Sequence, residues 1–408
     1  MLSFSPPDIT QAEIDEVVDT LQSGWITTGP KTKRLEAQLS DFCGTGRVAC
    51  LSSATAALEC ALRLLGIGPG DEVITSAYTY TASASPICHV GATPVLVDVA
   101  PGSYEMDPDA LAAAITGRTR AVVPVDIAGR MVDYDLLRAT LDDAAAPWHP
   151  ASECQEAIGH LPIVADGAHS LGAVRRGLRS GQAADLTTFS FHAVKNFTTA
   201  EGGALTWRAG MLDDDDAYRR LMLMSLHGQT KDALAKDKGG SWEYDIAFPG
   251  WKCNMTDIQA ALGLAQLKRY PGLLERRHRI IGLYAEALSD AGMTMLKHSS
   301  GDPWGEGFRS SGHLLILNLD GRSRAFRDEL IDRLAAAGVP ANVHYKPLPL
   351  LSAYRDLGFR EADFPQAVAL FENEVTLPLH TLLTDEDVCF IAEEFCRQKR
   401  QMEAEGLR

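Results

Sequence analysis

The first half of the chain alternates short apolar runs with segments whose apolar residues recur every three or four positions. The runs predict strands over residues 48–51, 72–77, 94–99, 120–127, 161–168, 185–191 and 203–207. Among the intervening segments, residues 57–68 and 107–115 have the periodicity of amphipathic helices. Short buried strands that alternate with helices predict a parallel α/β sheet covered on both faces.

The segment before the first strand predicts a helix with well-defined ends. Thr10 and Glu13 form a capping box, and Gly24 ends the helix. Its apolar face consists of Ile14, Val17, Val18 and Leu21. Further along, residues 142–160 predict an irregular insertion with its own short helix, and the acidic run 213–216 predicts a solvated helix start.

The pattern changes after about residue 255. Two long helices are expected over 256–269 and 273–292, with a break between them at Pro271-Gly272. A strand at 313–319 and helices at 323–338 and 384–406 follow. This succession predicts a large α/β domain over residues 1–255 and a smaller α+β domain over residues 256–408.

The composition and charge of the chain limit the kinds of molecule that it can bind. The chain has 408 residues, 46% of them apolar and 23% charged, which is typical of a globular protein. Its 38 basic and 54 acidic residues give a net charge of −16, so we expect no nucleic-acid and no membrane partner. Any anionic ligand must therefore be held by a local site.

Targeting and metal-binding signals are also missing from the sequence. No apolar run approaches the roughly 20 residues of a membrane-spanning helix. The first residues lack a basic segment followed by an apolar one, so the cytoplasm is the expected compartment. The eight cysteines show neither CxxC nor metal-ligand spacing, which predicts reduced thiols and no metal site.

Two segments place polar groups where a predicted strand ends. In residues 51–58 a strand gives way at once to a helix, whose free N–H groups can bind a phosphate or be satisfied by an ordinary cap. In residues 164–173 an apolar strand ends at Asp166, and His169 follows. A carboxylate there can keep a proton on a buried heterocyclic nitrogen, or it can simply cap a turn.

Two further segments supply an amine and an aromatic ring. Lys195 follows a predicted strand and lies near Ser190, His192 and Asn196. A desolvated lysine can form a Schiff base, although most lysines are solvated surface groups. Tyr78 and Tyr80 follow another buried strand, where one can lie against a flat ring or pack in the core.

A phosphate cradle, a carboxylate, an aromatic ring and a lysine together suit pyridoxal phosphate (PLP). In this interpretation Lys195 forms the Schiff base, and Asp166 keeps the pyridine nitrogen protonated so that the ring withdraws electrons. Ser190 and the Ala54–Thr55 turn hold the phosphate, and Tyr80 packs on the ring face.

The chain also carries a set of longer motifs. They include SGWITTGP, SSATAALECAL, VADGAHSLGA, FSFHAVKN, NMTDIQAALGLAQLKR and VHYKPL. In this combination the chain resembles the DegT/StrS-type nucleotide-sugar aminotransferases from about residue 4 to residue 395. The resemblance implies fold-type I: an aspartate-aminotransferase-like large domain with a mostly parallel seven-stranded sheet flanked by helices, plus a smaller C-terminal α+β domain.

The resemblance also implies roles for individual residues. Lys195 matches the Schiff-base lysine, Asp166 the partner of the pyridine nitrogen, and Tyr80 the stacking aromatic residue, while His169 is expected near the ring and its 3-hydroxyl. The phosphate-binding positions of the family match Ala54, Thr55 and Ser190. The expected substrate-binding residues are Thr28, His192, His227, His344 and Tyr345, each of which can also have a purely structural role.

Two positions depart from the family pattern. Lys252, in GWKCNM, stands where relatives often have Asn, in a stretch that reaches the phosphate of the neighbouring subunit. The resemblance therefore implies a homodimer with shared active sites. Asp126 stands where many relatives have His, so its role is open.

The resulting hypothesis is a PLP-dependent aminotransferase with ping-pong kinetics. By family analogy the amino donor is L-glutamate, and the acceptor is a keto sugar carried on a nucleotide diphosphate. A branch of the family with His in place of the lysine dehydrates its substrate, so Lys195 favours transamination. The alternatives are a dehydratase or lyase on the same fold, and a non-catalytic regulatory or sugar-binding relative, which has no need of Lys195.

Overall fold

A mostly parallel sheet of seven strands forms the centre of the larger part of the molecule. The computed structural model describes residues 2–144, 146–231 and 243–407. The strands lie in the order β3 (Thr93–Val97), β2 (Glu72–Ser76), β4 (Thr119–Val123), β5 (Val164–Asp166), β8 (Leu186–Ser190), β9 (Gly203–Trp207) and β1 (Val48–Leu51). Two parallel bridges, Val122–Ile163 and Val125–Asp166, join β4 to β5, and only β9 runs antiparallel to its neighbours. The predicted fold class is confirmed.

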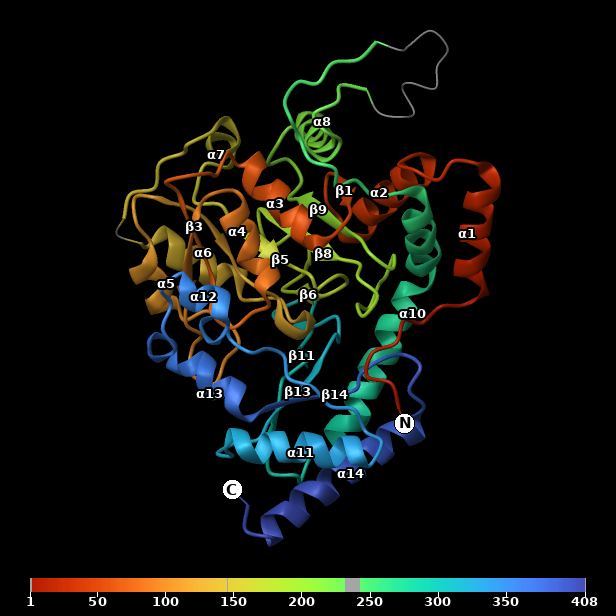
Figure 1. Ribbon diagram of the computed structural model, residues 1–408, viewed down its shortest axis with the longest axis vertical. Coiled ribbons are helices and arrows are strands. Elements are labelled where there is room, and N and C mark those ends of the chain that lie inside the picture. Colours follow the sequence, from red (N-terminus) through yellow and green to blue (C-terminus); the bar gives the residue numbers. More distant parts are fainter. Residues whose placement is uncertain (1, 145, 232–242, 408) are drawn as a thin grey trace.

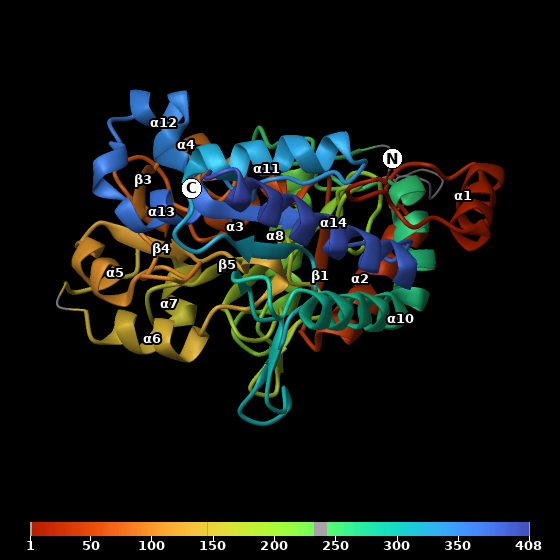
Figure 2. The same ribbon diagram turned by 90° about the horizontal axis from the view of Figure 1, so that it is seen from below.

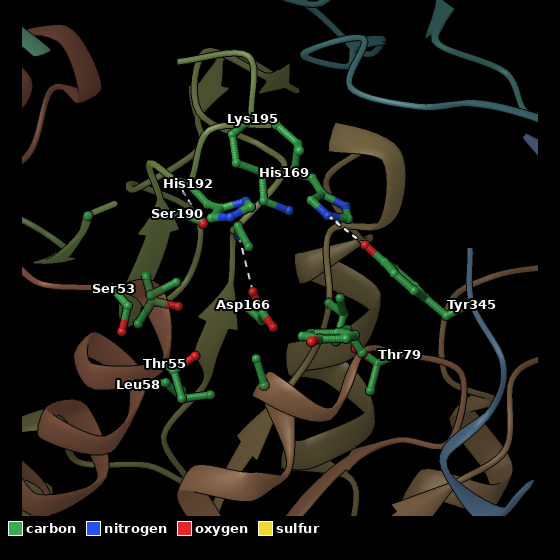
Figure 3. Close-up of a pocket in the computed structure, with 18 of the residues that line it drawn as sticks. Ser53, Thr55, Leu58, Thr79, Asp166, His169, Ser190, His192, Lys195 and Tyr345 are labelled. Atoms are coloured by element: carbon green, nitrogen blue, oxygen red, sulfur yellow. Dashed lines mark hydrogen bonds between the residues drawn. The ribbon is translucent and has the colours of Figure 1, made fainter. Parts of the chain in front are cut away.

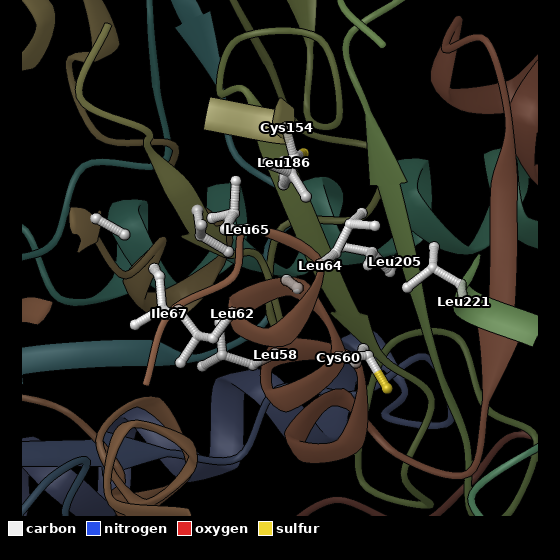
Figure 4. Packing of buried hydrophobic residues seen from close by; sticks show 14 of the residues in the cluster. Leu58, Cys60, Leu62, Leu64, Leu65, Ile67, Cys154, Leu186, Leu205 and Leu221 are labelled. Atoms are coloured by element: carbon white, nitrogen blue, oxygen red, sulfur yellow. The ribbon is translucent and has the colours of Figure 1, made fainter. Parts of the chain in front are cut away.

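Helices cover both faces of this sheet (Figure 1). On one face α3 (Ala54–Leu64) packs with α4 (Ser85–His89), α7 (Glu153–Ile158) and α8 (Asp214–Ser225). The other face is covered by α2 (Pro30–Cys43), α5 (Pro108–Ala114), α6 (Tyr134–Asp142) and α10 (Asp257–Ala287). Adjacent residues of a strand point to opposite faces, so Val73 packs in the α3 core shown in Figure 4 and Ile74 in the core on the other side. The central strands are therefore buried on both faces, as their short apolar runs predicted.

A second hydrophobic core lies in the C-terminal part. Its antiparallel sheet has the order β10 (Thr294–Met295), β13 (Leu315–Asn318) and β14 (Glu374–Leu377), and it packs against α10, α11 (Arg324–Ala336) and α14 (Asp385–Ala404). Two shorter helices, α12 (Ser352–Asp356) and α13 (Pro365–Asn373), follow α11. The domain boundary after residue 255 stays a prediction.

A small antiparallel sheet links the two parts of the chain. It contains β6 (Val174–Arg175), β7 (Leu178–Arg179), β11 (Ser299–Ser300) and β12 (Phe308–Arg309), in the order β11-β12-β6-β7. The hairpin of β11 and β12 projects from the body in Figure 2. Of the helices that the structure describes, none has the length and apolar character needed to cross a bilayer.

Two expectations about helices are wrong or incomplete. The predicted break at Pro271 is absent, because α10 continues through it. A proline removes one backbone hydrogen bond, but Tyr270 and Leu273 on either side of it are buried in the core and hold the helix. The first helix, α1 (Gln11–Ser23), has the predicted capping box and a left-handed Gly24, yet its apolar Ile14 and Leu21 are 48% and 54% exposed.

Candidate active site

A cavity of about 400 Å³ opens at the carboxyl ends of β5 and β8, beside the start of α3 (Figure 3). Ten of the predicted site residues line it: Ala54, Thr55, Tyr80, Asp166, His169, Ser190, His192, Lys195, His344 and Tyr345. Parallel strands end at the same edge of a sheet, which is where α/β proteins bind their ligands. The fold thus brings together side chains that are almost 300 positions apart in the sequence.

Lys195 lies in the loop after β8, and its backbone N–H donates to the carbonyl of His192 (2.9 Å). Its side chain is half-buried at the cavity wall, and its ammonium group has no hydrogen bond or ion pair within the described part of the chain. Burial lowers the pKa of Lys195 to about 8, while the nearby Asp166 carboxylate opposes that shift. An appreciable fraction of this amine is therefore neutral, and hence nucleophilic, near neutral pH.

Asp166 ends β5 and is buried. Its Oδ2 accepts a hydrogen bond from the Ser83 hydroxyl (2.6 Å), and its Oδ1 accepts one from the Ala168 backbone N–H (3.1 Å). Donors of this kind favour the ionised carboxylate. Ser83 was not predicted as a site residue, because nothing in its sequence context separates it from the other small residues of the 76–84 segment.

His169 follows β5 on the opposite side of the cavity from α3 (Figure 3). Its Nε2 lies 3.1 Å from the Tyr345 hydroxyl. Burial raises the pKa of Tyr345, so the phenol keeps its proton and can donate it to this nitrogen. The other ring nitrogen, Nδ1, is buried without a hydrogen-bond partner in the structure described.

A second buried histidine contacts the first, with the two rings tilted by 42°. The ring centres of His313 and His169 are 4.3 Å apart, and His313 Nδ1 lies 2.9 Å from the Asn196 side-chain oxygen. Burial lowers the pKa of both imidazoles well below the usual value, so both rings are neutral. His313 also escaped prediction, since a single His before an apolar strand resembles an ordinary core residue.

The start of α3 provides the candidate phosphate site. Ser53 caps the helix by accepting the Ala56 N–H (3.0 Å), while helix geometry leaves the first N–H groups, at Ala54 and Thr55, without intrahelical partners. Ser190 lies at the end of β8 on the same cavity. A Cβ at Gly203 would lie 2.3 Å from the Ala54 nitrogen, so only glycine allows β9 to approach the start of α3 this closely.

These groups fit PLP. The cavity combines an unpaired amine, a hydrogen-bonded carboxylate, an unpartnered buried imidazole nitrogen and a helix N-terminus. They match, in turn, an aldehyde, a protonated pyridine nitrogen, a polar ring substituent and a phosphate. Tyr80, which is 59% exposed at the cavity rim, contributes an aromatic face.

Three predicted residues do not line this cavity. Thr28 is buried, and its hydroxyl donates to the Met255 carbonyl. His227 follows α8 with a left-handed backbone (φ 62°), and its N–H donates to the Trp251 carbonyl (2.6 Å). The Lys252 side chain is exposed and donates to the Asn254 side chain. Their roles stay predictions.

Asp126 occupies a structural position beneath the cavity. It is buried, and its oxygens accept hydrogen bonds from Ser170 (2.6 Å), Tyr134 (3.0 Å) and the Val132 N–H (2.9 Å). Burial raises the pKa of Asp126 to about 7, although these donors oppose the shift. Because Ser170 directly follows His169, Asp126 stabilises the loop that carries the histidine.

Comparisons with known proteins agree with this geometry. The model of the DegT/DnrJ/EryC1/StrS aminotransferase family matches residues 7–395. The "Spore coat polysaccharide biosynthesis protein SpsC" of Bacillus subtilis is 37% identical over 393 residues, which cover 95% of this chain and 94% of that protein.

Solved structures give the same result. The PLP form of the "putative sugar aminotransferase Spr1654" of Streptococcus pneumoniae is 52% identical, with a TM-score of 0.93 and coverage of 98% of this chain and 99% of its own. PseC of Helicobacter pylori, an aminotransferase involved in the biosynthesis of pseudoaminic acid, is 26% identical, with a TM-score of 0.84 and coverage of 98% and 99%.

Proposed function

The chain belongs to the DegT/DnrJ/EryC1/StrS aminotransferase family, and on that premise we propose that it moves an amino group from L-glutamate to a keto sugar carried on a nucleotide diphosphate. It is a PLP-dependent sugar aminotransferase, which confirms the resemblance and the cofactor inferred from sequence. The donor, the nucleotide carrier and the roles of single residues are the proposed part.

One observation carries the assignment of roles: Lys195 is a half-buried, unpaired amine on the cavity wall, and its charge interacts with that of Asp166. Bound PLP supplies an aldehyde that exchanges amino groups and a ring that withdraws electrons. Lys195 is the residue that would hold the aldehyde in the resting enzyme. Displaced by the donor, its amine would act as the general base that takes the proton from the α-carbon of the donor, and as the general acid that delivers it to the former aldehyde carbon.

The remaining residues orient the cofactor. The Asp166 carboxylate, fixed by Ser83, would keep the proton on the pyridine nitrogen. Ala54, Thr55 and Ser190 would bind the phosphate, and His169 and Tyr80 would contact the ring. Each group lies on the same cavity, so no rearrangement of the backbone is needed for them to act together.

The acceptor would enter over His192, His344 and Tyr345, which lie on that cavity as well. Because the protein carries a net charge of −16, a diphosphate needs local donors to bind. We assign His227 and Thr28 to the acceptor. Lys252, which is exposed outside the cavity of its own chain, would reach the cofactor phosphate of a second copy.

A homodimer is part of this proposal. Ile14, Val18, Leu21 and Ile26 form an apolar surface on and after α1, and each is more than 40% exposed. Apolar patches of this kind mark protein–protein contacts. A two-fold symmetric dimer would bury this surface and give two equivalent shared sites.

Borohydride reduction of the PLP-loaded enzyme tests the central residue. We expect peptide mapping to find the reduced cofactor on Lys195 and no label in Lys195→Ala. Lys268→Ala, which removes an exposed lysine of α10, is the matched control and should label normally. Label on another lysine, or normal half-transamination by Lys195→Ala, would contradict the assignment.

A donor and acceptor screen tests the substrates. The enzyme is incubated with amino acids and a panel of nucleotide-linked keto sugars, and products are identified by mass. An aminated sugar formed with glutamate supports the proposal. A dehydrated sugar identifies the alternative chemistry on this fold, and a protein that shows no cofactor absorption after PLP is added supports a binding role.

A further inference from the structure

Three side chains form a hydrogen-bonded chain behind the cavity wall. Glu374 and Thr376 lie on β14, and the Glu374 carboxyl is completely buried. The Thr376 hydroxyl contacts Glu374 Oε1 at hydrogen-bond distance and lies 3.0 Å from Nδ1 of His344. The other carboxyl oxygen, Oε2, accepts the backbone N–H of His344 (2.8 Å).

His344 faces the cavity with its other ring nitrogen free. The residue lines the cavity, and Nε2 has no hydrogen-bond partner within the described part of the chain. Burial, together with the charge of Lys195, lowers the pKa of His344 to about 4, so the ring is neutral at physiological pH. A neutral imidazole carries its proton on one nitrogen only, and its hydrogen-bond partners decide which.

The Thr376 hydroxyl has one proton to give, so the three groups are linked. If Glu374 is ionised, Thr376 must donate to it and therefore accepts from His344 Nδ1–H, which leaves Nε2 as an acceptor. If Glu374 is protonated, the proton lies on Oε1, because Oε2 already faces an N–H. The carboxyl then donates to Thr376, Thr376 donates to Nδ1, and Nε2 carries the proton.

We propose that Glu374 is a positioning residue that acts through Thr376 to select which nitrogen of His344 bears the proton, and so whether His344 donates or accepts a hydrogen bond at the sugar substrate. This inference rests on the proposed function for the role of His344. With a neutral carboxyl, His344 presents an N–H to an oxygen of the acceptor. With an ionised carboxyl, it presents a lone pair instead.

The groups around the Glu374 carboxyl bring its ionisation close to physiological pH. Burial raises the pKa of Glu374 to about 8, against the opposing effects of Thr376, the His344 N–H and the Arg327 guanidinium. Arg327, on α11, donates to the Glu374 backbone carbonyl (3.1 Å) and pairs with Asp328.

The other titratable groups around Glu374 are phenols. They are Tyr78, whose hydroxyl donates to the His344 carbonyl (3.0 Å), together with Tyr104 and Tyr345. Burial raises the pKa of all three, so they stay neutral in this range. The Glu374 carboxyl is therefore the group of this cluster that changes charge near pH 8.

Nitrogen-15 NMR of the histidine-labelled, PLP-loaded enzyme tests the proposal without any acceptor. The signals of His344 are assigned by their loss in His344→Gln. In the wild type we expect the protonated nitrogen to change from Nε2 to Nδ1 with a midpoint near pH 8. In Glu374→Gln the amide donates permanently to Thr376, so Nε2 stays protonated throughout the titration.

Thr376 provides the matched pair of variants. Thr376→Val removes the hydroxyl and should abolish the change with pH, whereas Thr376→Ser keeps the hydroxyl and should retain it. This pair decides the question even if Glu374→Gln fails to fold. In kinetics, Glu374→Gln should flatten the pH dependence of the acceptor KM near pH 8, an effect that a merely structural role would not produce.

Two results would overturn the inference. One is a single protonation pattern of His344 across the titration of the wild type. The other is a pH-dependent change that persists in Glu374→Gln, which would assign it to a group other than Glu374. Neither result depends on the identity of the acceptor, so failure here is distinct from failure of the proposed function.

Discussion

Replacing Gly203 by alanine tests whether the start of α3 holds the cofactor phosphate. The added Cβ would lie 2.3 Å from the Ala54 nitrogen and 2.3 Å from the Ser53 carbonyl carbon, both of them backbone atoms. Ordinary contacts begin at 3.4 Å, so the helix start must move by about 1 Å. A displacement of that size takes an N–H out of hydrogen-bonding range of a phosphate fixed by other groups.

The expected loss follows from the energy of such a bond. A hydrogen bond to a charged group contributes about 1.5–3 kcal/mol, so losing one N–H weakens PLP binding roughly 10- to 150-fold. The measurement is a titration of the apoprotein with PLP, followed by fluorescence. Thermal unfolding of the same apoprotein reports how much stability the displacement removes.

Gly282→Ala is the control for this experiment. Gly282 lies in α10, and its added Cβ would meet no atom within 4 Å. Alanine there should leave PLP affinity unchanged and stabilise the helix by up to about 1 kcal/mol. Wild-type PLP affinity in Gly203→Ala would refute the placement of the phosphate at this helix.

Three other predictions use the same structure. The rate at which the apoenzyme captures PLP should rise with pH through about 8, because only the neutral Lys195 amine attacks an aldehyde. The Asp166 carboxylate raises the pKa of Lys195, so Asp166→Asn should shift this rise to lower pH. Leu62→Ala should lower the free energy of unfolding by about 2–5 kcal/mol in denaturant titrations, whereas the exposed Leu357→Ala should leave it nearly constant. Burial raises the pKa of Asp126 to about 7. Its protonation therefore adds to the free energy of unfolding at low pH, and this contribution is lost as pH rises through 7. Asp126→Asn should remove this pH dependence from denaturant unfolding curves.

Local sequence signals predicted the elements of the fold well. The capping box at Thr10 and the left-handed Gly24 depend only on neighbouring residues, and the structure has both. The continuation of α10 through Pro271 could not be predicted in this way, because the packing that holds it comes from distant elements. The apolar face of α1 was identified correctly, but a periodicity cannot tell whether a face packs inside its own chain or against another copy.

The residues of the candidate site show the same difference between local sequence signals and tertiary packing. Asp166 ends β5, and His169 and Lys195 lie in the loops after β5 and β8, so the rule that ligands bind at strand ends predicts their place on the cavity. Ser83 and His313 contact the cavity residues Asp166 and His169 only through tertiary packing, and they have no distinguishing neighbours in sequence. The link from Glu374 to His344 joins two segments 30 positions apart, and no short motif encodes it.

The length of α10 has a mechanical consequence. Its first half packs in the core next to the large sheet through Leu264 and Tyr270, and its second half packs in the C-terminal core through Ile280 and Tyr284. One continuous helix is thus part of both hydrophobic cores. Heating should therefore unfold both cores in a single cooperative transition. Two fragments made by dividing the chain at either end of α10 should aggregate unless they are produced together.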